Sequence, residues 1–122
     1  MSDMNLVREA IESTYIGTCT VIEHIKEKDD KTKQNKYIEK AVYEDKSCRL
    51  SFENISNTNQ TSTTNNVAQI VKLFIAPELQ IKNGSKIIVT QNNRTVEYKN
   101  SSEPAVYETH QEIVLQLFEG WA

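Results

Sequence analysis

The sequence contains few of the residues on which enzyme and metal sites depend. Its 122 residues include two histidines, two cysteines, three glycines and one tryptophan. The cysteines (Cys19, Cys48) and the histidines (His24, His110) follow no metal-ligand spacing. The isolated glycines form no phosphate-binding loop, and neither a nucleophile elbow nor a Ser-His-Asp order is recognisable. We therefore expect a protein without catalysis, bound metal or cofactor.

Long apolar runs and an excess of positive charge are also missing. No stretch approaches the ~18 apolar residues of a membrane-spanning helix, so no membrane association is expected. Residues 1–5 lack the basic and apolar regions of a secretory signal, which predicts reduced, buried thiols in a protein made in the cytoplasm. The net charge of −3 argues against tight binding through neutralised phosphates, because such binding needs clustered Lys and Arg.

One short motif, His110-Gln111-Glu112, raises the question of acid–base chemistry. In a strand, residues two apart point to the same side, so His110 and Glu112 would share a face and Gln111 would not. A surface ion pair or a histidine that anchors the backbone is the simpler interpretation, and we adopt it.

Apolar periodicity divides the chain into one helix and several strands. Residues 3–14 place Leu6, Val7, Ala10 and Ile11 on one helical stripe. After this helix the period changes to two. Residues 18–46 predict a long hairpin whose strands, 18–27 and 36–46, flank a charged tip.

The remaining segments also alternate like strands. They are 48–53, 67–76, 86–91, 94–99 and 111–118. Asn92-Asn93 predicts a two-residue hairpin turn, and Asn83-Gly84 predicts another tight turn. Many short strands with evenly spaced turns indicate a mainly β protein. We expect a partly open β-barrel or sandwich of antiparallel strands with one short N-terminal helix, as a single domain over 1–122 with its remaining strands in 67–119.

A polar segment interrupts these strands. Ordering one backbone residue costs about 1–2 kcal/mol, whereas burying the one apolar side chain of the segment returns about 1.5–3 kcal/mol. We therefore expect a mobile loop that partners must order, and a loop of this length inside a compact domain is typical of a functional element. Its residues are Asn54, Ile55, Ser56, Asn57, Thr58, Asn59, Gln60, Thr61, Ser62, Thr63, Thr64, Asn65 and Asn66.

The stretch from Asn83 to the C-terminus resembles the C-terminal half of small head–tail connector proteins of tailed bacteriophages and prophages, most closely the Gram-positive contractile-tail prophage type. The resemblance rests on a Gly84-Ser85-Lys86 turn, a Pro104-x-x-Tyr107 element and a His110-x-Glu112 strand. It continues upstream through CRLSF at 48–52 and VAQIVKLFIAPEL at 67–79, so it covers most of the chain.

This resemblance implies a head completion (stopper) protein. Family members form a ring below the portal and adaptor, and a long loop projects into the central channel; the matching segment here is 54–66. The implied partners are other copies of the chain, the portal or adaptor above, the tail terminator or tail tube below, and genomic DNA that passes without sequence-specific binding. The implied location is the host cytoplasm during assembly and then the neck of the virion.

Two alternatives remain open. A tail terminator or tail completion protein would occupy the next ring, and an OB-like single-stranded nucleic-acid-binding module belongs to another class. The second would use Tyr37 and Tyr43 with neighbouring lysines, but acidic residues lie among them, and half-buried packing with a hydroxyl at the rim is the simpler interpretation. The candidate partner-contact residues are Leu6, Ile11, Phe118 and Trp121. Trp121 could equally cap its own domain.

Overall fold

The computed structural model describes residues 3–28, 30–56 and 67–121. In this part of the chain one helix precedes seven strands. They are α1 (Asp3–Glu12), β1 (Gly17–Lys28), β2 (Asn35–Ser56), β3 (Val67–Ile75), β4 (Lys86–Gln91), β5 (Arg94–Asn100), β6 (Ala105–Val106) and β7 (Gln111–Leu117).

The strands form one antiparallel sheet that returns on itself. Its order is β3-β2-β1-β4-β5-β7-β6, and β3 also pairs with β7. This last pairing runs from Val71–Leu115 to Ile75–Gln111 and joins the two ends of the sheet into a hydrogen-bonded ring. The predicted mainly β, antiparallel fold with one short N-terminal helix is confirmed. The ring closure is a contact between distant segments, which local periodicity does not reveal.

The interior of this ring is the hydrophobic core. Alternate residues of each strand point inward, as the pleat of a sheet requires. The buried apolar side chains are Cys19, Val21, Cys48, Leu50, Leu73, Ile75, Ile81, Ile87, Val89, Tyr98, Ile113 and Leu115. Both cysteines are free as well as buried, so they act as small apolar core residues.

Strand β2 differs from its prediction. The sequence indicated two strands, 36–46 and 48–53, but the structure has a single strand of 22 residues. It pairs with β1 up to Cys48 and with β3 from Cys48 onward. Register shifts interrupt the β1–β2 pairing on both sides of Val21, and Asp45 has a φ of 50°. Such bulges bend a strand and increase its twist, so β2 changes neighbours without ending.

Most other local predictions agree with the structure. Asn92 and Asn93 have φ values of 54° and 62° and join β4 to β5 as the predicted two-residue turn. Gly84 has a φ of 87° in the turn closed by the Ser85 N–H to Lys82 carbonyl bond of 3.1 Å. The helix is shorter than the predicted 3–14, because it ends at Glu12 and a turn follows.

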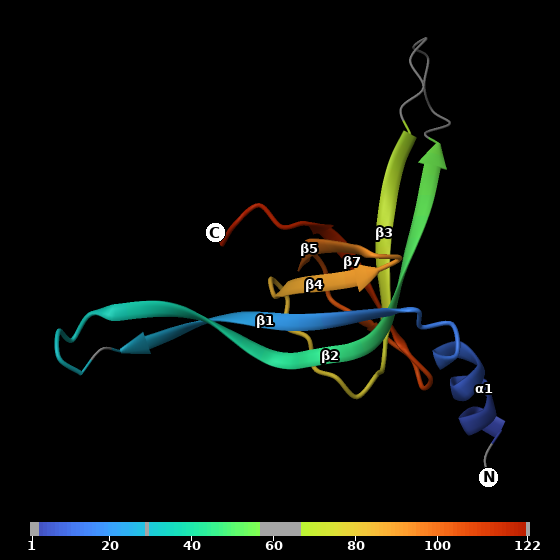
Figure 1. The fold of residues 1–122 in the computed structure, drawn as a ribbon, viewed down its shortest axis with the longest axis horizontal. Helices are drawn as coiled ribbons and strands as arrows, with labels where there is room; N and C mark the ends of the chain where they lie inside the picture. Colours follow the sequence, from blue (N-terminus) through green and yellow to red (C-terminus); the bar gives the residue numbers. More distant parts are fainter. Residues whose placement is uncertain (1–2, 29, 57–66, 122) are drawn as a thin grey trace.

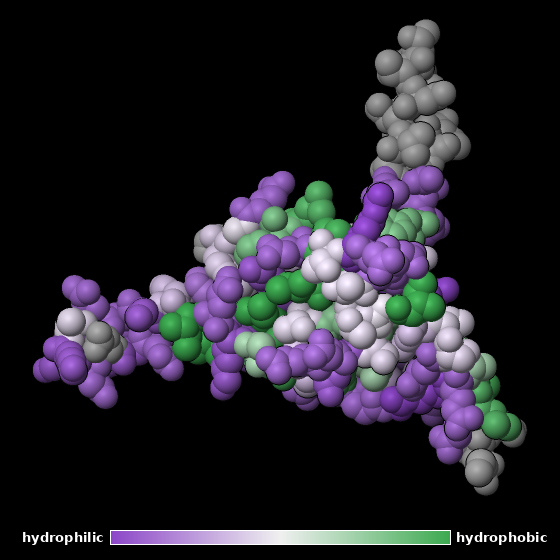
Figure 2. Space-filling model, in the orientation of Figure 1, coloured by the Kyte–Doolittle hydropathy of each residue, from purple (hydrophilic) through white to green (hydrophobic). Residues whose placement is uncertain are grey.

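Three projections leave the ring in different directions (Figure 1). The hairpin arm consists of residues 23–28 of β1 and 35–40 of β2, and it extends along the longest axis. The β2–β3 arm consists of residues 53–56 and 67–70. The third projection is α1. Hydrophilic side chains dominate the hairpin arm, whereas hydrophobic ones gather on the body and over α1 (Figure 2).

Candidate functional site

The β2–β3 arm contains the start of the predicted channel loop. Strand β3 reaches β7 only from Val71 onward, so among the described strands residues 67–70 pair with β2 alone. Asn54, Ile55 and Ser56 are not loop residues as predicted. They belong to β2, because they pair in register with Gln69, Ala68 and Val67. The rest of the predicted loop, 57–66, lies outside the described residues.

An amide side chain closes the base of this arm where β2 leaves β1. Gln91 Oε1 accepts the Leu50 N–H at 2.8 Å, and Gln91 Nε2 donates to the Leu50 carbonyl at 3.4 Å. Gln91 thus satisfies both backbone groups of Leu50, as a neighbouring strand would. Gly17 lies beside this contact. A Cβ there would be 3.0 Å from the Thr90 carbonyl oxygen and 3.1 Å from Gln91 Oε1, so any larger residue would press on this contact.

The hairpin arm is held by side chains paired across its two strands. Ile25 faces Ile38, between the opposite-charge pairs Glu23–Lys40 and Glu27–Lys36. Such cross-strand pairs are the units that stabilise a two-stranded ribbon. The arm is nevertheless a structure of marginal stability, because beyond Ile22–Lys86 β1 pairs with no described strand other than β2.

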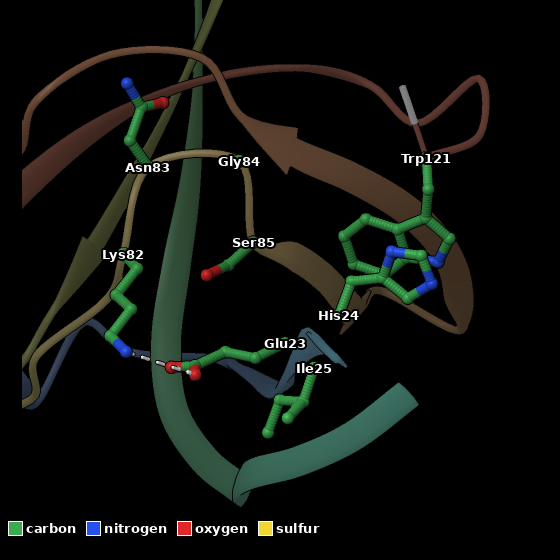
Figure 3. A pocket seen from close by; sticks show the side chains of 8 residues that line it. All are labelled: Glu23, His24, Ile25, Lys82, Asn83, Gly84, Ser85 and Trp121. Carbon is green, nitrogen blue, oxygen red and sulfur yellow. Dashed lines mark ion pairs between the residues drawn. The ribbon is translucent and has the colours of Figure 1, made fainter. Parts of the chain in front are cut away.

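The predicted interface residues Phe118 and Trp121 meet at the base of the hairpin arm. Trp121 stacks on His24 with ring centroids 4.5 Å apart, and it contacts the edge of Phe118 at 5.0 Å. Its Nε1–H donates to Glu39 Oε1 at 2.9 Å. Figure 3 shows Trp121 over His24 beside the 82–85 turn, where these residues line an open hollow of about 400 Å³. The indole therefore packs against its own domain and remains half-buried.

Charge reinforces this C-terminal cluster. The Trp121 hydrogen bond and the Lys86 ammonium lower the pKa of Glu39 below its usual range. Lys86 Nζ lies 3.4 Å from Glu39 and 4.7 Å from the centre of the Phe118 ring, a cation–π contact. Phe118 and Trp121 thus bind β1, β2 and β4 through ring stacking, a hydrogen bond and a cation–π contact.

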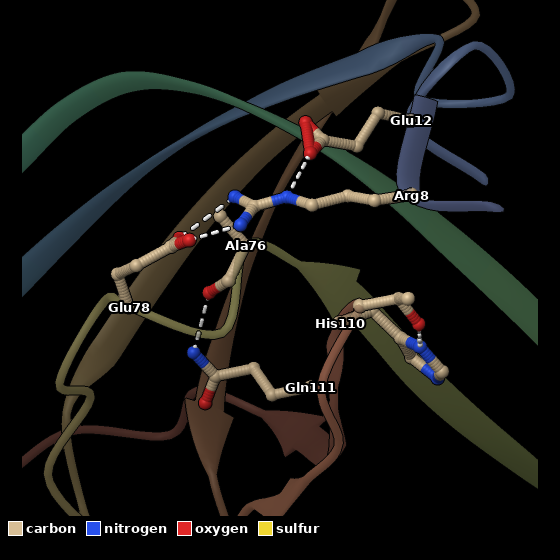
Figure 4. A network of polar contacts seen from close by, with 7 residues as sticks. Arg8, Glu12, Ala76, Glu78, His110 and Gln111 are labelled. Carbon is tan, nitrogen blue, oxygen red and sulfur yellow. Dashed lines mark hydrogen bonds and ion pairs between the residues drawn. The ribbon is translucent and has the colours of Figure 1, made fainter. Parts of the chain in front are cut away.

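The other predicted interface residues, Leu6 and Ile11, lie on α1. Leu6 is exposed, whereas Ile11 is half-buried. Arg8 fixes the helix to the connector after β3, because its guanidinium holds Glu78 with two hydrogen bonds and also contacts Glu12 (Figure 4). The hydrogen bond from Arg8 lowers the pKa of Glu78.

A buried glutamine supports the connector that receives Arg8. Gln111 Nε2 donates to the carbonyl oxygen of Ala76 at 2.7 Å (Figure 4). It also donates to the carbonyl oxygen of Leu79 at 2.7 Å. A buried polar side chain is tolerated where its hydrogen bonds are made inside the protein. Gln111 thereby fixes the turn that carries Glu78, and through it the orientation of α1.

His110 and Glu112 share a face, as predicted from strand alternation. His110 Nε2 lies 3.0 Å from Glu112 Oε2, and its Nδ1 lies 3.1 Å from the Thr109 hydroxyl. Its ring also stacks on Tyr107 with centroids 5.0 Å apart. Both nitrogens have partners within the chain, which agrees with the structural interpretation of this pair.

One end of the ring exposes apolar side chains, and we call it the apolar mouth. It consists of Phe52, Val71, Val96 and Leu117, which continue the inward-facing rows of β2, β3, β5 and β7. Phe52 is 53% exposed and Leu117 is 64% exposed. Two adjoining hollows, of about 470 and 440 Å³, share Phe52 and Tyr98 in their linings.

The described residues offer neither a metal site nor a helix that could cross a membrane. They contain no group of three or more His, Cys, Asp or Glu side chains suited to hold a metal ion. None of their helices has the length and apolar character needed to cross a membrane.

Comparison with known proteins identifies a structural neighbour. No protein-family model matches the chain, and no curated protein matches it by sequence. The solved structure of the phage-like element PBSX protein xkdH from Bacillus subtilis matches with a TM-score of 0.53 and 15% sequence identity. The match covers 84% of this chain and 93% of that chain. The two proteins share a fold.

Sequence reasoning did not single out the apolar mouth. Phe52 and Leu117 both follow the inward alternation of their strands, so the sequence predicts them as core residues. They are exposed because the ring ends before they are covered. A signal was present in β2, where polar residues begin immediately after Phe52.

Proposed function

We propose that this chain is a phage or prophage virion protein of the head–tail connector, acting as the head completion (stopper) ring. The observation that carries the proposal is the shared fold with a protein of the phage-like element PBSX, over 84% of this chain. The sequence resemblance of residues 83–122 and 48–79 to connector proteins supports the same assignment independently.

The projections of the fold also support a role in assembly. Two-stranded arms are marginal in water by themselves, so two such arms in one small protein are useful when partners order them. A cyclic ring would place several β2–β3 arms around one axis and give each arm identical neighbours. Residues 54–66 begin on this arm, and they would close and open the channel through neutral polar contacts.

The proposed partners follow from this position. Copies of the chain form the ring, the portal or adaptor contacts it from the head, and the tail terminator or tail tube contacts it from below. Genomic DNA passes without sequence-specific binding, which suits a chain with a net charge of −3. The protein would act in the host cytoplasm during assembly and in the neck of the virion afterwards. A tail terminator is the nearest alternative role.

The test is complementation of phage particles that lack the gene. Without the protein, electron microscopy should show separate heads and tails, and the full chain should restore joined particles. A variant in which an Asn-Gly turn replaces residues 57–66 should fold normally, because the register of the arm ends at Ser56–Val67. Its particles should release DNA or fail to join tails.

Two results would contradict the proposal in different ways. Joined, DNA-filled particles in the absence of the gene would exclude a connector role. Normal DNA retention with the shortened variant would exclude a gating role for residues 57–66. It would leave the proposed ring of subunits in place. A matched control replaces the described hairpin tip, residues 30–34, with the same Asn-Gly turn, and it should retain DNA.

A further inference from the structure

The apolar mouth is a surface that the described chain leaves uncovered. Phe52 and Leu117 are 53% and 64% exposed, above the buried side chains of Tyr98 and Leu115. Large apolar side chains gathered at one place on a soluble protein mark an interaction site more often than scattered ones do. The two adjoining hollows give this surface a concave shape, which suits a ridge of apolar side chains.

Helix α1 presents such a ridge. Met4, Leu6 and Val7 are 44%, 59% and 46% exposed. A helix of ten residues is marginal in water unless its apolar face is covered. Arg8 holds one flank of α1 against Glu78, and Leu6, two positions away in the helix, does not share that flank.

The two surfaces lie at different ends of the ring. In β3, Val71 belongs to the mouth, whereas Ile75 leads into the connector that carries Glu78 and binds α1. In β7, Leu117 belongs to the mouth, whereas Gln111 holds that same connector. A helix held at the connector is therefore remote from the mouth of its own chain.

We propose that α1 of one copy docks in the apolar mouth of the next copy. This inference rests on the proposed ring of subunits and names the contact between neighbouring subunits that would build it. Each copy carries one ridge and one concave mouth, so the contact is head-to-tail, the arrangement that generates closed rings or open filaments. Charge is also complementary. Glu9 flanks Leu6 on the helix and Arg94 borders the mouth, and neither has an ion-pair partner among the described residues.

Cysteine cross-linking of the full chain tests the contact even if it is weak. The native Cys19 and Cys48 are buried and should not react. Leu6→Cys and Leu117→Cys chains are mixed and treated with a short bis-maleimide. The matched control is Val106→Cys, because Val106 is 63% exposed and lies outside both surfaces. The Leu6→Cys and Leu117→Cys pair should give a dimer yield on the order of tenfold above the Leu6→Cys and Val106→Cys pair, because docking raises the effective concentration.

Further chains separate the possible outcomes. Adding Met4→Asp to the Leu6→Cys chain should reduce the yield to that of the control, and Glu9→Arg should be rescued in part by Arg94→Glu on the partner chain. The double variant Leu6→Cys/Leu117→Cys should give a ladder of cross-linked oligomers.

Two results would overturn this contact. One is a yield equal to the control. The other is a cross-linked monomer from the double variant at high dilution, which would mean that α1 covers its own mouth. Either result would leave the connector role to be decided by the complementation of phage particles. If complementation excluded the connector role, the cross-linking result would still decide whether α1 docks in the apolar mouth.

Discussion

Gln91 is the residue on which the junction between the ring and the β2–β3 arm depends. At Leu50 the strand β2 has left β1, and its backbone N–H and carbonyl would face a gap without the glutamine amide. A buried backbone group without a partner costs about 1–3 kcal/mol. The bidentate contact of one side chain therefore allows a strand to change neighbours at low cost.

We expect Gln91→Ala to lower the free energy of unfolding by about 1–3 kcal/mol, because both backbone groups of Leu50 lose their partner. Chemical denaturation followed by circular dichroism measures this change. Gln116→Ala is the matched control, since Gln116 is an exposed strand glutamine, and a surface change of this kind should stay within about 0.5 kcal/mol. Equal effects of the two substitutions would show that the Gln91 contact is not structural.

Residue chemistry also explains what the sequence could predict. Asn92-Asn93 and Asn83-Gly84 were recognisable because these residues adopt positive φ at little cost. Gln91 was not recognisable as a backbone partner, because its role depends on Leu50, 41 positions away. The contacts of Trp121 with His24 and Glu39 were hidden for the same reason.

At the scale of elements, local patterns located most strands but not their connections. Alternation identified β4 with its observed bounds, and β5 and β7 with an error of one residue at their C-terminal ends. It divided β2 in two at Ser47, between the predicted strands 36–46 and 48–53, whereas β2 continues through this position with a φ of 50° at Asp45. The predicted polar loop began too early, at Asn54. Residues 54–56 pair with 67–69 through their backbones, and the polarity of the side chains does not indicate such pairing.

Helix α1 should detach from the connector in acid. The hydrogen bond that Arg8 of α1 donates to Glu78 lowers the pKa of Glu78 from the ordinary value of 4.5. A carboxyl with a lowered folded-state pKa stabilises the folded contact above its unfolded pKa, and this contribution is lost as the pH falls through the folded pKa. The contact should therefore be intact near neutral pH and weaken progressively below 4.5.

Nuclear magnetic resonance of the Arg8 and α1 resonances between about pH 7 and pH 3 follows this change. Because the ion pair is largely exposed, its effect on global stability should be small, and the local shifts are the informative quantity. In Glu78→Gln the transition should be reduced, because the carboxyl that accepts the Arg8 hydrogen bonds is gone. A transition of the same size in this variant would assign the acid sensitivity to another group.

At the scale of the whole molecule, stability is distributed unevenly. The closed ring contains the buried core, whereas the two arms and α1 project from it with few contacts of their own. Segments with few buried apolar contacts are expected to open most readily. This organisation suits a subunit that is complete in its centre and depends on neighbours at its edges.

The nucleic-acid-binding alternative can be distinguished from the connector role at this scale, because binding of nucleic acid depends on the electrostatic field of the entire chain. The protein carries 14 basic and 17 acidic residues, and on the hairpin arm Lys36 and Lys40 face Glu27 and Glu23 across the strands. Tyr43 is half-buried against the core and its hydroxyl accepts the Gln80 N–H at 3.0 Å, so its ring is not free to stack on a base. Tyr37 is exposed and stacks on His24.

We therefore expect filter binding at about 0.15 M salt to show no saturation of single-stranded DNA at micromolar protein, because too few phosphates are neutralised. If saturation is observed, Tyr37→Ala should abolish it and Tyr107→Ala, which changes a similarly exposed tyrosine away from the arm, should not. That pattern would favour an OB-like binder with its surface on the hairpin arm. Absence of saturation would leave the net negative charge consistent with a ring through which DNA slides without being held.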